Sequence, residues 1–211
     1  MTLGILLNQN MLTPAAALLG SSNNGNTREL LFAALDANII SQVSEFFRSE
    51  APPLRENFLV YLEMLNNLAE TAYMSDDEVC ATRFSDSFFH FAQNNLTGRL
   101  IAALCSTVNR SNSNDDKKEE ADLNRAISLF LNVLILISSH PSGAQGLEEI
   151  TNCLYLSTAN STVVSNLLIS KPASLLPVLR LTAKVTRNCK VEQKPQLSGG
   201  SFLSVVVDVF R

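Results

Sequence analysis

Apolar residues recur along this chain at helical spacing, in stretches that prolines and polar residues interrupt. Leu31, Leu35 and Ile39 lie four residues apart, and a pair of prolines at 52–53 ends the pattern that they begin. Side chains at this spacing share one face of an α-helix, and proline does not continue a helix. With 46% apolar residues the chain can also bury a continuous core. These features predict an all-α fold.

Residues that cap helices mark two of the expected helix starts. Asn26 precedes Glu29 by three residues, and Ser75 precedes Glu78 by three. This is the arrangement of a capping box, in which the two side chains bind free N–H groups of the first helical turn. A break near residues 37–38 is expected to divide the first segment into two short helices.

The most hydrophobic segment of the chain runs from Ala121 to Ser138. Its longest apolar run, Ile127 to Ile137 broken by Ser128 and Asn132, is about half the roughly 20 residues that are needed to cross hydrocarbon. We therefore expect a core helix at the centre of the fold, with neighbours all round, and no contact with a membrane. The preceding segment, 109–120, is polar and charged without periodicity, and is expected to be a flexible loop.

Two segments resemble the helices of armadillo-type (armadillo and HEAT) repeat proteins. The stretch TRELLFAALDANIISQVSEFFRSE from Thr27 resembles the first two helices of such a repeat, and ENFLVYLEMLNNLAE from Glu56 resembles the third. A second copy would run from Ser75 to Ser138, and ASLLPVLRLT from Ala173 is similar to the turn into a second helix. The copies are uneven, with a period well above the family's ~40 residues.

This resemblance implies one armadillo-like domain over residues 1–211, a right-handed solenoid of about eight to ten helices. The third helices would line a concave face. Leu136 stands where an asparagine of the family's peptide-binding ladder would lie, and the chain has no Trp. A partner is therefore expected to bind a surface of this chain's own. The apolar final segment, 202–210, is what a fragment of a longer protein would show.

Charge and cysteine usage bear on partners and on the compartment. The formal net charge is −4, and no stretch is expected to gather Lys and Arg onto one face, which argues against nucleic acid as a partner. Four widely spaced cysteines without a CxxC pair are read as reduced thiols. The N-terminus, 1–20, lacks the basic region of a signal peptide. We expect a cytoplasmic or nuclear protein.

The sequence offers little catalytic chemistry. His90 lies among phenylalanines and His140 precedes a proline, so each reads as a core or capping histidine rather than a catalytic one. Asp115 to Glu119 match the DDxxE pattern of magnesium-binding helical enzymes, but a polar loop flanked by lysines would not hold the carboxylates rigidly. We predict no enzyme activity, no metal and no cofactor, with a helical metal-dependent enzyme as the least favoured alternative.

The predicted function is an interaction scaffold that binds a helix or peptide of another protein. Apolar terminal segments keep open the alternative of a self-associating module, for instance a homodimer. The candidate binding residues lie on the two expected third helices, where they either face outward or pack against the next repeat. They are Tyr61, Glu63, Met64 and Asn67 on the first helix, and Asn124, Ser128 and Asn132 on the second.

Overall fold

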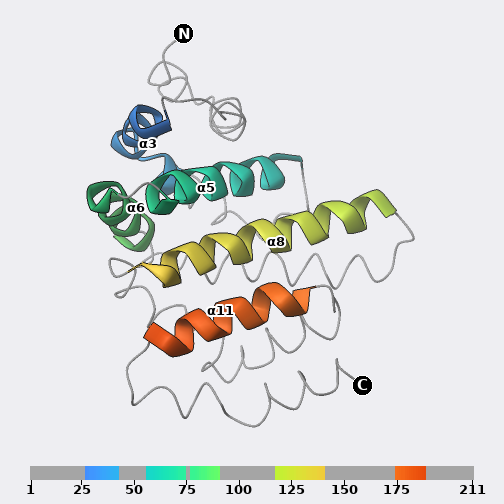
Figure 1. Cartoon of the computed structure of the whole chain (residues 1–211). Helices are drawn as coiled ribbons and strands as arrows, with labels where there is room; N and C mark the ends of the chain where they lie inside the picture. The colour runs from blue at the N-terminus through green and yellow to red at the C-terminus, as the bar shows by residue number, and fades with distance from the viewer. Residues whose placement is uncertain (1–26, 43–55, 75–76, 91–116, 141–173, 189–211) are drawn as a thin grey trace.

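The computed structural model contains only helices as regular structure in the residues that it describes. The described residues are 27–42, 56–74, 77–90, 117–140 and 174–188. Their helices are α3 (Thr27–Asp36), α5 (Glu56–Met74), α6 (Glu78–His90), α8 (Lys117–Ser139) and α11 (Leu175–Asn188) (Figure 1). This confirms the all-α class for that part of the chain. The predicted cap Asn26 and both apolar terminal segments lie outside the described residues.

The predicted break after the first helix is confirmed. α3 ends at Asp36, residues 37–38 form a turn, and the chain is helical again from Ile39. Asn38 has a φ of 52°, in the left-handed region that asparagine tolerates better than most residues. The amide of Gln42 donates to the Asn38 carbonyl and its side chain donates to the Ala37 carbonyl, at 3.2 and 3.1 Å. These bonds satisfy carbonyls that the break would otherwise leave free.

The cap of α6 differs from the prediction. The helix begins at Glu78, and the Asp77 carboxylate accepts a hydrogen bond of 3.0 Å from the amide of Val79. The Asp77 carbonyl accepts the first helical bond, from Ala81 at 3.2 Å. Asp77 is therefore the N-cap, two residues later than predicted, and the side chain of Ser75 lies outside the described residues.

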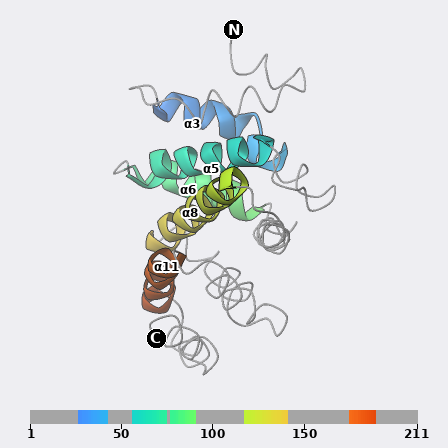
Figure 2. The ribbon, with the colours of Figure 1, turned by 90° about the vertical axis from the view of Figure 1, so that its right-hand side faces the viewer.

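The start of α8 also differs from the prediction. The helix begins at Lys117, so the last four residues of the segment expected to be a loop, 117–120, are helical; 109–116 lie outside the described residues. The prediction failed because charged residues are common both in solvated loops and in exposed first turns of helices, so a charged composition does not distinguish the two. The predicted central position is confirmed, since α8 packs between α5 and α11 (Figures 1 and 2).

The three stacked helices α5, α8 and α11 run in the same direction. Arg125, near the start of α8, contacts Glu63, whereas Asn132, two turns later, contacts Glu70. At the other side, Asn188 at the end of α11 donates to the carbonyl of Ser138 at the end of α8. Residue numbers thus increase together along each pair of helices, and each neighbouring pair is parallel.

The core lies between these helices and beneath α3 and α6. α5 buries an apolar stripe of Tyr61, Leu62, Leu65, Leu68 and Ala69. α8 buries residues on most of its circumference, which are Leu123, Ala126, Ile127, Phe130, Leu131, Val133, Leu134 and Ile137. The expectation of neighbours all round holds except along one stripe, where Ser128 is exposed and Leu129 and Ile135 are half-buried.

The helix α3 packs on both α5 and α6. Arg83 of α6 pairs with Asp36 at the end of α3 and lies 4.7 Å from the centre of the Phe32 ring. Both charged side chains are largely exposed. A surface ion pair and a cation–π contact therefore hold this corner of the fold.

By length and composition alone, one stretch of the described helices could cross a membrane. It is Ala121–Ser139, and half of it is buried within the fold. This stretch is longer than the apolar run Ile127 to Ile137, because its mean hydropathy stays high in spite of the scattered polar residues. Its buried side chains face α5 and α11, as in a core helix.

Candidate functional site

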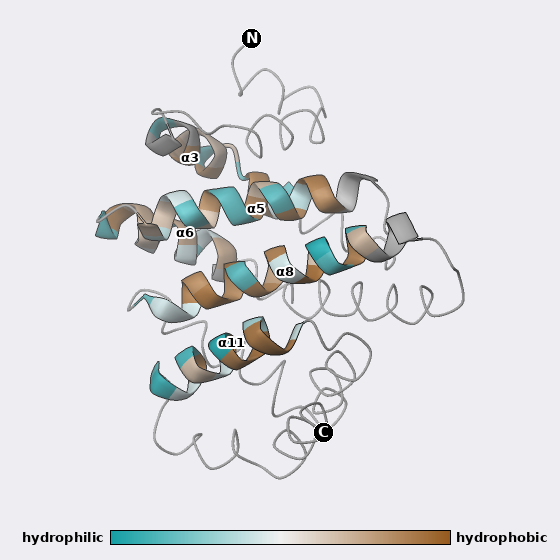
Figure 3. Cartoon of the chain, turned by 45° about the vertical axis from the view of Figure 1, so that its right-hand side comes forward, coloured by the Kyte–Doolittle hydropathy of each residue, from teal (hydrophilic) through white to brown (hydrophobic). Residues whose placement is uncertain are grey.

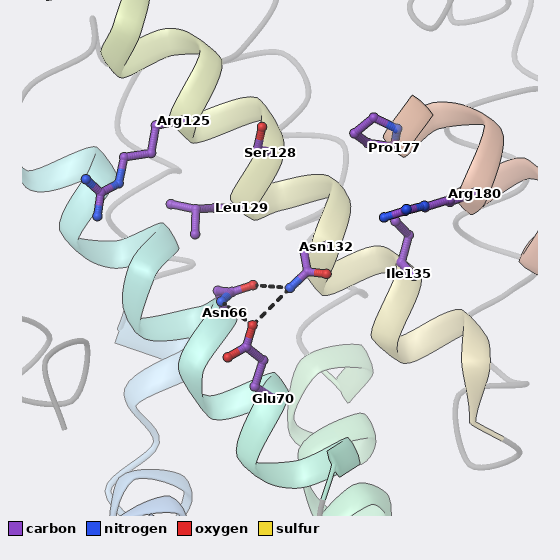
Figure 4. Close-up of a pocket in the computed structure, with 9 residues that line it drawn as sticks. All are labelled: Asn66, Glu70, Arg125, Ser128, Leu129, Asn132, Ile135, Pro177 and Arg180. Carbon is purple, nitrogen blue, oxygen red and sulfur yellow. Dashed lines mark hydrogen bonds between the residues drawn. The ribbon is translucent and has the colours of Figure 1, made fainter. Parts of the chain in front are cut away.

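An open pocket lies where the stacked helices α5, α8 and α11 meet. Its volume is about 390 Å³, and Figure 4 shows its walls. Two residues come from α5, five from α8 and two from α11: Asn66 and Glu70; Arg125, Ser128, Leu129, Asn132 and Ile135; and Pro177 and Arg180. We call this pocket the groove.

A network of amides and a carboxylate forms one wall of the groove. The Asn132 amide donates to Asn66 Oδ1 at 2.8 Å and to Glu70 Oε1 at 3.1 Å (Figure 4). The Asn66 amide donates to the same Glu70 oxygen at 3.0 Å. Asn66 is only 7% exposed, so its polar atoms need these partners. The network joins α5 to α8, and it uses both N–H groups of the Asn132 amide and one of the two N–H groups of Asn66.

The charges around the groove are unequally paired. Arg125 binds Glu63 at 2.6 Å, and Glu70 accepts the two amide bonds. Arg180 is exposed and extends from α11 toward α8 (Figure 4). Within the described part of the chain Arg180 has no ion-pair partner. On the α5 side of the groove the charged groups therefore bind one another or the amides, whereas the α11 side is cationic.

Arg180 belongs to a basic face, which corrects the expectation that no stretch gathers Lys and Arg. Arg180, Lys184 and Arg187 are four and three residues apart on α11, a spacing that places them on one face of a helix. Val178, Leu181 and Val185 form the opposite, buried face. Hydrophilic residues accordingly interrupt α11 and end it (Figure 3). The three residues are separated by apolar and small polar residues in the sequence, so they form one face only in the helical register.

The predicted binding residues divide into three groups. Ser128 and Asn132 line the groove, and Glu63 forms an ion pair with Arg125, which also lines it. Asn67 and Asn124 are half-buried and do not line it. Tyr61 and Met64 are 3% and 0% exposed, so of the two alternatives kept for them the packed one holds. They are buried because α5 packs against α3, α6 and α8 together, which leaves few directions open to solvent.

Two groove residues on α5 were missed. Asn66 and Glu70 are four residues apart, and Glu63 stands three residues before Asn66. Polar residues at positions i, i+3 and i+7 of an apolar helix share a face. That pattern was visible in the sequence, but only the fold shows that this face meets α8.

A second polar cluster lies where α5, α6 and the end of α8 meet. The hydroxyls of Tyr73 and Ser85 are hydrogen-bonded, and the Tyr73 ring centre lies 5.6 Å from Phe84 and 5.5 Å from His140. Burial raises the pKa of Tyr73 to about 12, partly offset by the bond to Ser85. His140 thus contacts an aromatic cluster.

Neither cluster has the composition of a metal centre. No group of three or more His, Cys, Asp or Glu side chains within the described ranges is arranged around a common point. Cys80 is a free, buried thiol, and the other three cysteines lie outside those ranges.

We compared the chain with models of protein families, with curated proteins and with solved structures, and none of the three comparisons gave a match. Membership of the armadillo-like family therefore stays a prediction from sequence.

Proposed function

We propose that this chain is a non-enzymatic interaction scaffold, an irregular armadillo-like solenoid that binds a helix or peptide of another protein in the groove. The observation that carries the proposal is the groove itself, an open pocket of about 390 Å³ that three helices form from sequence positions 66 to 180. A surface assembled from distant segments is typical of proteins that present a binding face.

The direction of the stacked helices supports the solenoid. Neighbours in an up-and-down bundle are antiparallel, because short loops connect them. Here α5, α8 and α11 are parallel neighbours, and residues that bond across them are 62 and 66 apart in the first pair and 50 in the second. Such separations leave room for returning helices between successive layers, as in a repeat stack.

The character of the groove supports binding to protein. Leu129 and Ile135 are half-buried on its floor, beside the exposed Ser128 and the amide of Asn132. Binding sites for peptides and helices combine apolar contact with a few fixed polar groups in this way. The volume fits a few side chains and not a whole helix, so a partner would insert one face and remain exposed on the other.

The test places a photoreactive diazirine amino acid at Ser128, in the full-length chain in its native cells. Ser139 is the matched control: both are exposed serines of α8, and both donate to the carbonyl four residues earlier, at 2.9 and 2.6 Å. Only Ser128 lines the groove. We expect position 128, and not position 139, to cross-link to a defined segment of another protein.

The cross-linked segment is then made as a synthetic peptide and titrated by calorimetry. Ser128→Trp fills the groove and is expected to weaken binding at least tenfold, while Ser139→Trp leaves it unchanged. Equal cross-linking from both positions, or equal affinity of the two Trp variants, would refute the groove as the binding site. Cross-links to a second copy of this chain would instead indicate self-association.

A further inference from the structure

The exposed face of α11 continues the groove beyond the pocket itself. Leu176 is 57% exposed and lies one turn before Arg180 on the same face. Lys184 and Arg187 follow at one and two further turns, half-buried and exposed. Along about 16 Å of helix, at 1.5 Å per residue, the face therefore carries an apolar side chain and then three basic ones.

These three basic side chains lack acidic partners within the described residues. The two ion pairs that join one described residue to another belong to other arginines, Arg83 with Asp36 and Arg125 with Glu63. α11 contains no Asp or Glu of its own. In a chain whose net charge is −4, a helix with three cations and no anion is a local excess of positive charge.

The opposite wall determines how far a negative partner can extend. Glu70 stands on α5 and accepts bonds only from neutral amides, so its negative charge would repel a ligand that is negative on every side. A partner that suits both walls is acidic on one side only. The half-buried Leu129 and Ile135, together with Leu176, require apolar side chains next to those acids.

The amide network determines whether that partner is helical or extended. An extended chain needs outside partners for its backbone groups, whereas a helix satisfies its own. In the groove the Asn66 amide is used by Glu70, and the Asn132 amide by both Asn66 and Glu70. Asn132 thus has no N–H left for a bound backbone, and Asn66, which keeps one, is only 7% exposed. The amide wall therefore favours a partner that satisfies its own backbone groups.

We infer that the groove and the basic face of α11 bind an amphipathic helix of a partner protein, one whose acidic residues lie at i, i+4 and i+7 beside an apolar stripe. This inference rests on the proposed function and adds to it the charge and conformation of the partner. The acids meet Arg180, Lys184 and Arg187, and the apolar stripe meets Leu176 and the floor of the groove.

The test selects binders from a displayed library of helical peptides about 15 residues long, or four turns, against the purified full-length chain. Selected peptides are resynthesised and titrated against four variants. Ser128→Trp and Ser139→Trp report on the groove, Arg180→Glu with Lys184→Glu reverses the basic face, and Lys117→Glu with Lys118→Glu makes the same charge change at the start of α8. Circular dichroism confirms that each variant is folded.

We expect the selected peptides to carry acids at helical spacing beside apolar residues. Reversal at 180 and 184 should weaken binding roughly fivefold or more for each charge, and a peptide with its acids changed to Lys should recover affinity for that variant. The control pair at 117 and 118 should leave binding unchanged. A proline in the middle of the peptide should abolish binding, because it breaks a helix.

Other outcomes separate the two proposals. Peptides that lose affinity on Ser128→Trp but keep it on charge reversal, or that tolerate the proline, would overturn this inference and leave the groove as a binding site. A scrambled peptide of the same charge, or a single-stranded oligonucleotide, binding as well as the selected peptide would overturn it in favour of a general anion surface. Selected peptides that are indifferent to Ser128→Trp would overturn the proposed function itself.

Discussion

Replacement of Asn132 by alanine tests whether the amide network holds α8 against α5. The change removes two hydrogen bonds, to Asn66 Oδ1 at 2.8 Å and to Glu70 Oε1 at 3.1 Å. A bond between neutral groups contributes about 1 kcal/mol and one to a charged group about 1.5 to 3. Because the network is only partly buried, we take the lower values and expect a loss of about 2 to 3 kcal/mol.

A matched control separates this loss from helix propensity. Asn124 lies on the same helix, is half-buried like Asn132, and makes no side-chain hydrogen bond within the described residues. Alanine is the better helix former by roughly half a kcal/mol at either position, so the difference between the two variants removes that contribution. Asn124→Ala is therefore expected to be neutral or slightly stabilising.

The free energy of unfolding is measured by urea titration, followed by helical circular dichroism, and the melting temperature gives a second reading. At this chain length each kcal/mol corresponds to roughly 2 to 4 °C, so Asn132→Ala should melt about 4 to 12 °C below the Asn124→Ala protein. If the two variants unfold within 0.5 kcal/mol of one another, a threshold about the size of an ordinary surface effect, the network does not stabilise the contact between α5 and α8.

Three further predictions concern other parts of the fold. Burial raises the pKa of Tyr73 from 10.0 to about 12, so its protonated form favours the folded state; its contribution is complete below pH 10 and is lost toward pH 12, by up to roughly 3 kcal/mol. Tyr73→Phe should cost about 1 kcal/mol at pH 8 and should flatten the alkaline fall of stability, and an unchanged slope in urea titrations from pH 8 to 11 would contradict this. Phe84→Ala, in a fully buried aromatic stack, should cost about 3 to 5 kcal/mol, against about 0.5 or less for Val79→Ala on the exposed face of the same helix, and comparable urea midpoints would disprove the packing. Arg83→Ala should cost no more than about 1 kcal/mol, and the cost should shrink in high salt; a larger, salt-independent loss would mean that this corner is not held by exposed charges.

Features that depend on neighbours in sequence were predicted well. The break at residues 37–38, the helix from Glu56 and the end of the core helix near Ser138 were all predicted from the local sequence, and each lies close to the predicted place. Helix ends were less accurate where several polar residues compete to cap, as at Asp77. There the packing of the rest of the helix determines where its first turn lies, and therefore which residue caps it.

Features that depend on the rotation of a helix about its axis were predicted poorly. The sequence left open whether Met64 faces outward or packs inside, and the structure shows it fully buried. Contacts between segments are harder still, since Asn66 and Asn132 meet across 66 residues of sequence. The basic face of α11 is different in kind, because its spacing was present in the sequence and needed only the helical register to be found.

The two sides of α8 explain why α11 determines the charge of the proposed partner. α8 is apolar enough to span a membrane by composition, yet one stripe carries Arg125 and Asn132, which would each need a polar partner in any apolar surrounding. α5 supplies those partners through Glu63 and through its share of the amide network, so Arg125 and Asn132 are already matched within the chain. On the other side α11 brings cations and no acid. The positive charge that no acid of the described residues neutralises therefore lies on the α11 side, where an acidic helix of a partner would bind.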